Sequence, residues 1–166
     1  MKRATIIRVL TLALSAALAA VALAACMPQA NTANEEQKAN RQYMAQVNQT
    51  MDDLSDKLEG FTDAVVRGDV VTMRTQADNA LKVLDELEAL EAPEVLADVK
   101  AGYVEGCASL REALKAYVDL YTEIDSASDA QPFDFSNYGT RLKEIQKAYD
   151  EGIAKLQETD AKAAEL

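Results

Sequence analysis

The feature that most constrains this chain is the spacing of its apolar residues, which recur at steps of three and four in four successive segments. The clearest segment places Leu96, Val99, Tyr103, Cys107, Leu110, Leu114, Tyr117, Tyr121 and Ile124 at such steps. This spacing puts side chains on one face of an α-helix. No strand-like alternation competes with it, so the chain is predicted to be all-α.

Breaks in the pattern predict helices over about residues 35–67, 69–91, 93–125 and 135–163. Connections this short force neighbouring helices to run in opposite directions. We therefore expect residues 35–166 to form an antiparallel up-down four-helix bundle. Its core should consist of Leu, Val, Met and Ala, with Tyr at the edges.

Helix starts and stops also have local signals in the sequence. Gly68-Asp69 supplies a stop followed by an N-cap, and Pro93 suits the first turn of the next helix. Turn residues (DSASDAQP) precede the last segment. Asp134 or Ser136 is expected to cap the last helix at its N-terminus.

The first residues have the pattern of a secretory signal. Lys2, Arg3 and Arg8 precede or enter a run of Ala, Leu, Val and Ile that extends over residues 6–25, and no acidic residue occurs before Glu35. An apolar run of about 20 residues is also long enough to span a bilayer as a helix. Length alone therefore leaves a cleaved signal and a permanent span both open.

The end of this run, Leu23-Ala24-Ala25-Cys26, resembles the lipobox of bacterial lipoproteins. That resemblance implies removal of residues 1–25 and attachment of diacylglycerol to the Cys26 sulfur, often with N-acylation. Two or more acyl chains anchor a protein stably. Residues 26–34 then form a lipidated tether that holds the bundle at the cell membrane, on its extracytoplasmic face. Because Met27 is not Asp, an outer-membrane destination stays open.

The resemblance covers residues 1–26, and the rest of the chain suggests no specific family.

The charge of the chain excludes one class of partner. The sequence has 17 basic and 28 acidic residues, and losing the three basic residues of the signal takes the net charge from −11 to −14. Such a chain is repelled by nucleic acid and by anionic lipid. The expected contact with the membrane is therefore the lipid anchor, and nucleic-acid binding is excluded.

The absence of histidine argues against most catalytic and metal chemistry. It removes serine triads, most zinc and haem sites, and the Glu-x-x-His pattern of di-iron bundles. The Asp125–Ala130 stretch fails as a calcium loop because Ala127 and Ala130 stand where an oxygen ligand and a glycine are needed. We therefore predict no catalytic residue, cofactor or metal site, and a protein that is not an enzyme.

Two features of the third segment have a packing interpretation beside a functional one. Cys107 lies on the apolar seam and is predicted to be a buried, inert thiol. A second stripe consists of Gly102, Gly106, Ser109, Ala113 and Ala116. This stripe indicates close approach of a neighbouring helix in the bundle, with an external helix as the alternative.

Acidic residues gather where the second and third helices are expected to join. They are Asp85, Glu86, Glu88, Glu91, Glu94 and Asp98. A solvated helix end explains them most simply. The functional alternatives are a weak divalent-cation patch and a surface that keeps the bundle away from anionic lipid.

Aromatic residues Phe133, Phe135 and Tyr138 lie in and after the longest loop. They are the predicted partner-contact site, although such residues more often fold back as a lid over the end of a bundle. The sequence thus predicts a lipid-anchored binding or scaffold module of the bacterial cell envelope with a protein partner there. The alternative is a ligand-sensing or solute-binding accessory subunit, with its site between the helices near Tyr103, Tyr117 and Tyr121.

Overall fold

A computed structural model describes residues 35–165, and the predicted signal and tether lie outside this range. Four helices pack against one another: α2 (Glu35–Arg67), α3 (Val70–Ala89), α4 (Ala97–Asp125) and α5 (Tyr138–Ala163). A short 3₁₀ helix, η2 (Glu94–Leu96), precedes α4. The described residues contain no strand, so the all-α prediction is confirmed.

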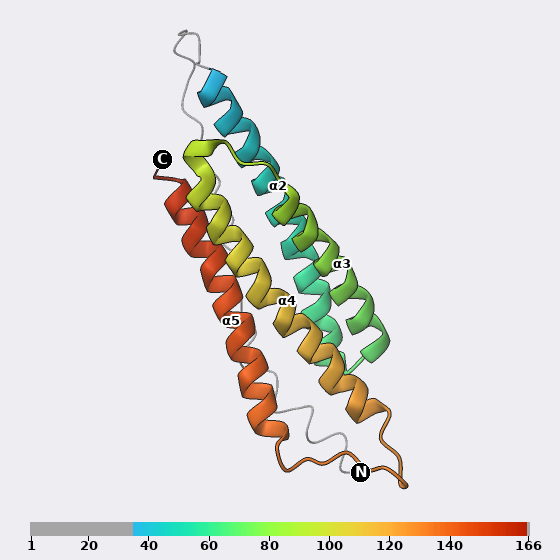
Figure 1. Cartoon of the computed structure of the whole chain (residues 1–166). Coiled ribbons are helices and arrows are strands. Elements are labelled where there is room, and N and C mark those ends of the chain that lie inside the picture. Colours follow the sequence, from blue (N-terminus) through green and yellow to red (C-terminus); the bar gives the residue numbers. More distant parts are fainter. Residues whose placement is uncertain (1–34, 166) are drawn as a thin grey trace.

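The helices lie side by side along one long axis (Figure 1). Helix α4 packs closely against both α3 and α5, and α3 packs against α2. The first turns of α2 project beyond the connection between α3 and α4 (Figure 1). No helix among residues 35–165 is long and apolar enough to cross a bilayer.

The boundary between α2 and α3 follows the local signals in the sequence. Gly68 has a φ of 66°, a left-handed conformation that glycine adopts without steric cost. The side chain of Asp69 accepts a hydrogen bond from the Thr72 backbone N–H at 3.0 Å and so caps α3. The Thr72 hydroxyl also donates to Asp69 Oδ2 at 2.6 Å, and these two hydrogen bonds lower the pKa of Asp69.

Two helix starts lie later than predicted. Helix α4 begins at Ala97 rather than near residue 93, because Glu94–Leu96 form the 3₁₀ helix η2, and the predicted start of α5 is also wrong. Helix α5 begins at Tyr138 rather than near residue 135, and its N-cap, Asn137, makes no side-chain capping bond. Asp134 instead accepts hydrogen bonds from the backbone N–H and the hydroxyl of Ser136, at 2.8 and 2.9 Å. This local turn competes with the helix for residues 134–136, so neither residue caps α5.

The core contains more tyrosine than the sequence suggested. Its aliphatic part follows the predicted seams, with Val47, Leu54, Leu84, Leu110 and Leu114 buried. Tyr103 and Tyr117, however, are among the largest fully buried side chains, and Tyr43 and Tyr149 are buried as well. The expectation that tyrosines lie at the edges is therefore wrong. Rings that each supply a hydroxyl fill the centre of this bundle, and those hydroxyls need partners.

Glycines set the spacing between α4 and α5. A Cβ added at Gly106 would stand 2.8 Å from Leu156 Cδ2, and one added at Gly152 would stand 2.8 Å from the backbone nitrogen of Leu110. Gly102 lies similarly close to Thr159. These contacts place the small residues Gly102 and Gly106 against α5, as the intramolecular interpretation of the stripe predicted.

Candidate functional site

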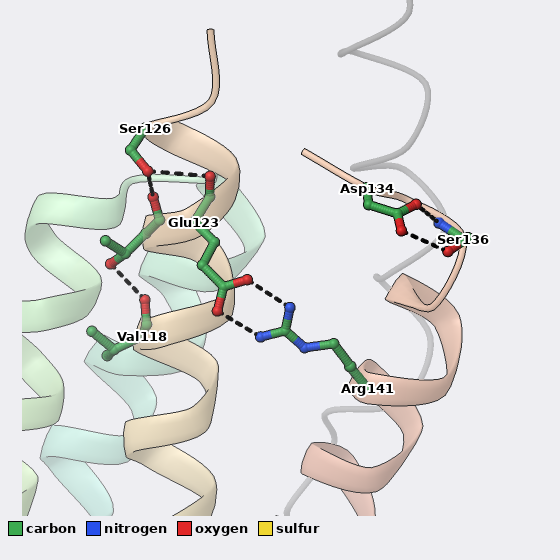
Figure 2. Close-up of polar contacts among 7 residues, drawn as sticks. Val118, Glu123, Ser126, Asp134, Ser136 and Arg141 are labelled. Atoms are coloured by element: carbon green, nitrogen blue, oxygen red, sulfur yellow. Dashed lines mark hydrogen bonds and ion pairs between the residues drawn. The ribbon is translucent and has the colours of Figure 1, made fainter. Parts of the chain in front are cut away.

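The connection between α4 and α5, residues 126–137, is built from hydrogen-bonded turns. The Ser126 hydroxyl donates to the Thr122 and Glu123 carbonyl oxygens, at 2.8 and 3.2 Å, where α4 ends. Ser128 and Gln131 exchange backbone hydrogen bonds at 3.1 and 3.2 Å. The Asp134–Ser136 turn completes the loop (Figure 2). These bonds fix the segment that carries the predicted contact residues.

An ion pair clamps the two helices at the base of this loop. Arg141 on α5 donates through both terminal nitrogens to the Glu123 carboxylate on α4, at 2.6 and 2.7 Å (Figure 2). This two-bond geometry is the most directional form of a salt bridge. The hydrogen bonds from Arg141 lower the pKa of Glu123. The clamp therefore holds the ends of the loop at a fixed separation.

The structure brings Phe133, Phe135 and Tyr138 together as one ring cluster. The ring centroids of Phe133 and Phe135 are 4.7 Å apart, and those of Phe135 and Tyr138 are 6.0 Å apart. The third pair, Phe133 and Tyr138, is separated by 6.4 Å. Such edge-on or tilted contacts stabilise aromatic clusters beyond the area they bury.

The three rings divide into two roles. Phe133 and Tyr138 are half-buried and pack against the core, which matches the lid alternative. Phe135 is 50% exposed and does not pack against the core. Of the three residues predicted to contact a partner, only Phe135 therefore has a largely accessible ring, and it rests on the two half-buried rings of Phe133 and Tyr138.

The tyrosines proposed for a ligand site are packed against one another. Tyr117 stands at the centre, with its ring centroid 5.8 Å from that of Phe61 and 6.5 Å from those of Tyr121 and Tyr149. Burial is the main cause that raises the pKa values of Tyr117 and Tyr121. It also raises the pKa of Tyr149 to about 12. These rings fill the centre of the bundle themselves.

Two of these hydroxyls bind side chains of α5. Tyr117 donates to Gln146 Oε1 at 2.6 Å, and Gln146 in turn donates to Asp150 Oδ1 at 2.8 Å. Tyr103 donates to Asp160 Oδ1 at 2.5 Å. Burial raises the pKa of Asp160, and the Tyr103 hydrogen bond opposes part of that rise. These bonds join α4 to α5.

Gln146 and Asp160, the partners of the two tyrosines, are not identifiable from the apolar pattern of a single helix. Once α4 and α5 are known to pair, these partners can be predicted from residue numbers. The Tyr103–Asp160, Tyr117–Gln146 and Glu123–Arg141 contacts all follow the same register between the two helices.

A hollow on α5 does not serve the ligand alternative either. Its lining consists of the largely exposed residues Lys143, Gln146, Lys147, Asp150, Glu151 and Ala154. None of the tyrosines named for a ligand site contributes to this lining.

The acidic segment near the α3–α4 connection is partly neutralised. Arg111 on α4 pairs with Asp85 at 2.8 Å and with Glu88 at 3.0 Å. Lys100 donates to the Leu90 carbonyl oxygen at 2.6 Å and so bonds to the end of α3. Within residues 35–165, no group of three or more acidic or cysteine side chains is placed to hold a metal ion.

Cys107 is completely buried on the core face of α4, as predicted. Burial raises the pKa of its thiol to about 12, and nearby Glu88 adds to the rise. A thiol with this pKa is almost entirely protonated near neutral pH and is a poor nucleophile. Cys26, the predicted lipidation site, lies outside the described residues.

Comparison with known proteins identifies no relative. No family model matches the chain, and neither a curated protein nor a solved structure matches it significantly.

Proposed function

We propose that this protein is a lipid-anchored module of the bacterial cell envelope that binds a protein partner at the end farthest from its anchor. The observation that carries the binding part is the clamped loop, which presents Phe135 half-exposed on a base of two half-buried rings. Aromatic side chains are enriched in the cores of protein interfaces, and this one is held on a base of two further rings.

The lipid anchor rests on the lipobox at Leu23-Ala24-Ala25-Cys26 and the basic and apolar segments before it. Lipidation at Cys26 would leave a short tether before Glu35, the first residue of α2. The protein would then lie outside the cytoplasm and close to a membrane.

We further infer an antiparallel up-down order for the four helices. The contacts between α4 and α5 pair the start of one helix with the end of the other, as in Tyr103–Asp160 and Glu123–Arg141. The α3–α4 contacts behave alike, since Arg74 bonds Thr122 at 2.7 Å near one end and Glu88 bonds Arg111 farther along.

This order separates two ends of the bundle. The acidic end comprises residues 85–98 and Asp160, and the loop end comprises residues 123–141. In Figure 1 the start of α2 lies toward the acidic end, and the loop lies at the opposite end. Helix α4, with 29 residues, would hold the loop about 44 Å from the acidic end. An anchor before α2 therefore directs Phe135 away from the membrane.

Metabolic labelling tests the anchor. Cells expressing the full chain are fed an alkyne-tagged fatty acid, and the purified protein is examined for the tag and for its mass. The full chain should carry the tag and lack residues 1–25, and Cys26→Ala should carry no tag. A tag that persists in Cys26→Ala, or an uncleaved N-terminus in the unaltered protein, would contradict the anchor.

The packed tyrosines leave the solute-binding alternative without a supporting observation, because their rings occupy the space between the helices where that alternative needs a ligand.

A further inference from the structure

The chain segment between Lys115 and Arg141 carries charge of one sign. Between Lys115 and Arg141 the chain has no basic residue, and it has five acidic ones: Asp119, Glu123, Asp125, Asp129 and Asp134. The same stretch supplies every ring of the Phe133–Phe135–Tyr138 cluster. Aromatic surface and negative charge therefore occur together on one short segment.

The structure leaves most of this negative charge available. Arg141 is the basic residue nearest in sequence to the loop, and the Glu123 carboxylate neutralises it through two hydrogen bonds (Figure 2). Asp125 and Asp129 are exposed and form no ion pair with any residue of the described range. Asp134 bonds only to neutral groups of Ser136. Asp125, Asp129 and Asp134 thus form no ion pair with any described residue, although a second guanidinium, that of Arg74, reaches the end of α4 and donates to Thr122.

The exposed ring supplies the second half of the site. Phe135 directly follows Asp134, and its ring rests against Phe133 and Tyr138. The face of an aromatic ring attracts a cation, most often the guanidinium of Arg, and nearby carboxylates attract the same charge. Val66, Val71 and Phe135 are among the exposed large apolar side chains of the described range. Arg74, one turn after Val71 on α3, donates a hydrogen bond to Thr122 near the end of α4. Val71 therefore lies at the same end of the bundle as the loop.

We propose that the loop end docks a cationic polypeptide segment, with an Arg or Lys side chain over the Phe135 ring and its charge near Asp125, Asp129 and Asp134. This inference rests on the proposed function and names the chemistry of its partner. The opposite charge of the loop favours a basic partner. It disfavours a second copy of this acidic chain and an anionic lipid surface, because both would bring like charges together.

The test uses the purified product of the full chain. It is held in nanodiscs of zwitterionic phosphatidylcholine, which add no net charge of their own, if Cys26 carries lipid, and it is used directly in solution if Cys26 does not. The probe is a dye-labelled, unstructured peptide of repeated Arg-Gly-Ser, and a second peptide has citrulline in place of Arg. Fluorescence anisotropy gives the dissociation constant of each. We expect the Arg peptide to bind, the citrulline peptide to bind at least about tenfold more weakly, and affinity to fall with added salt.

Variants locate the site. The triple change Asp125→Asn, Asp129→Asn and Asp134→Asn should weaken binding by about tenfold or more. Asn at position 134 retains an oxygen acceptor for Ser136, so the loop turn is kept. Phe135→Leu should weaken binding about threefold, because it keeps apolar bulk and removes the ring face.

A matched control lies at the acidic end. The triple change Glu91→Gln, Glu94→Gln and Asp98→Asn removes the same number of charges from a site away from the loop and should leave affinity within about twofold. Equal losses in the two triple variants would overturn the proposal, because they would indicate bulk attraction to an acidic protein. Equal binding of the citrulline peptide, or unchanged binding by Phe135→Leu, would also overturn it.

These outcomes are distinguishable from failure of the proposed function. A tag absent from Cys26 would remove the anchor and leave the peptide result standing. Absence of peptide binding, with the tag present, would remove the cationic partner alone.

Discussion

The acidic end and the loop end of the bundle are both rich in carboxylates, and each end has paired and unpaired ones. Glu91, Glu94 and Asp98 at the acidic end are exposed and form no ion pair with any described residue. At the acidic end, Asp85 and Glu88 pair with Arg111, and Asp160 accepts the Tyr103 hydroxyl. At the loop end, Glu123 is paired, but Asp125 and Asp129 are exposed and lack an ion pair with any described residue. The comparison teaches that carboxylates without an ion pair do not by themselves mark a contact surface, and that the exposed aromatic ring of Phe135 beside them is what distinguishes the loop end.

The two ends also differ in their connections. Four residues separate α3 from η2, whereas twelve residues, 126–137, separate α4 from α5. The long connection holds the aromatic cluster, including the half-exposed Phe135. The short one includes Leu90 and Ala92, which pack against the core. This contrast can be tested by comparing how much substitutions at buried and at exposed positions change the stability of the protein.

The largest effect on stability is expected at Gly152 of α5. Gly152→Ala should lower the free energy of unfolding by about 3 kcal/mol, because its Cβ would meet the Leu110 backbone, which cannot easily move. Gly139→Ala is the control near the loop, since a Cβ there meets no atom within 4 Å. It should be neutral or slightly stabilising. Urea unfolding followed by circular dichroism measures both, and equal losses would contradict the close α4–α5 packing.

The hydroxyls of Tyr103 and Tyr117, which bond to different parts of α5, should contribute different amounts to the free energy of unfolding. Tyr103→Phe should cost about 2 kcal/mol, because it leaves the half-buried carboxyl of Asp160 without its donor. Tyr117→Phe should cost about 1 kcal/mol, since its acceptor is the neutral amide of Gln146. Urea unfolding of both variants checks the order. A larger loss in Tyr117→Phe would show that the charged acceptor adds nothing.

Substitutions in the ring cluster can distinguish a residue that covers the core from one that is free to contact a partner. Phe133→Ala should destabilise the protein by about 1 kcal/mol, because it removes a half-buried ring from the core edge. Phe135→Ala should change stability by less than about 0.5 kcal/mol, as is usual for an exposed position. Thermal unfolding of the pair gives the comparison. Equal destabilisation by both changes would make Phe135 part of the lid.

The smallest effect is a pH dependence at the acidic end. The pKa of Asp160 is raised in the folded protein by burial, so its contribution to stability is greatest below the ordinary Asp pKa, about 3.9. That contribution falls as pH rises through the folded pKa. Asp160→Asn keeps an oxygen for Tyr103 and removes this loss. The variant should gain stability relative to wild type from pH 3 to pH 7, measured by urea unfolding at each pH, and a constant difference would contradict the raised pKa.

Much of the fold follows from local sequence patterns. The heptad spacing and Gly68 define α2 with the bounds found in the structure, and the predicted N-cap at Asp69 is the observed one. The start of the last helix is more difficult to predict, because a polar side chain near a helix start can either cap the helix or close a turn before it. Asp134 closes a turn with Ser136 instead of capping the helix, and that choice depends on how the loop returns to the bundle.

The residues of the candidate site could be predicted from the sequence, but which of their side chains is exposed could not. The sequence identifies Phe133, Phe135 and Tyr138 as neighbours, but only packing decides that Phe135 is the exposed ring. The buried tyrosines were misplaced at the edges because a hydroxyl suggests contact with water. Gln146 and Asp160 supply those partners from another helix, and a single helical seam gives no information about a facing helix.

Photocrosslinking in intact cells tests the central claim, that the loop end is the contact surface, most directly. A benzophenone amino acid replaces Phe135 in one variant of the full chain and Val95 in another, since Val95 is 63% exposed near the acidic end. We expect crosslinks to protein from position 135 and few or none from position 95. Crosslinks to protein from position 95 alone, or equally from both positions, would contradict the account.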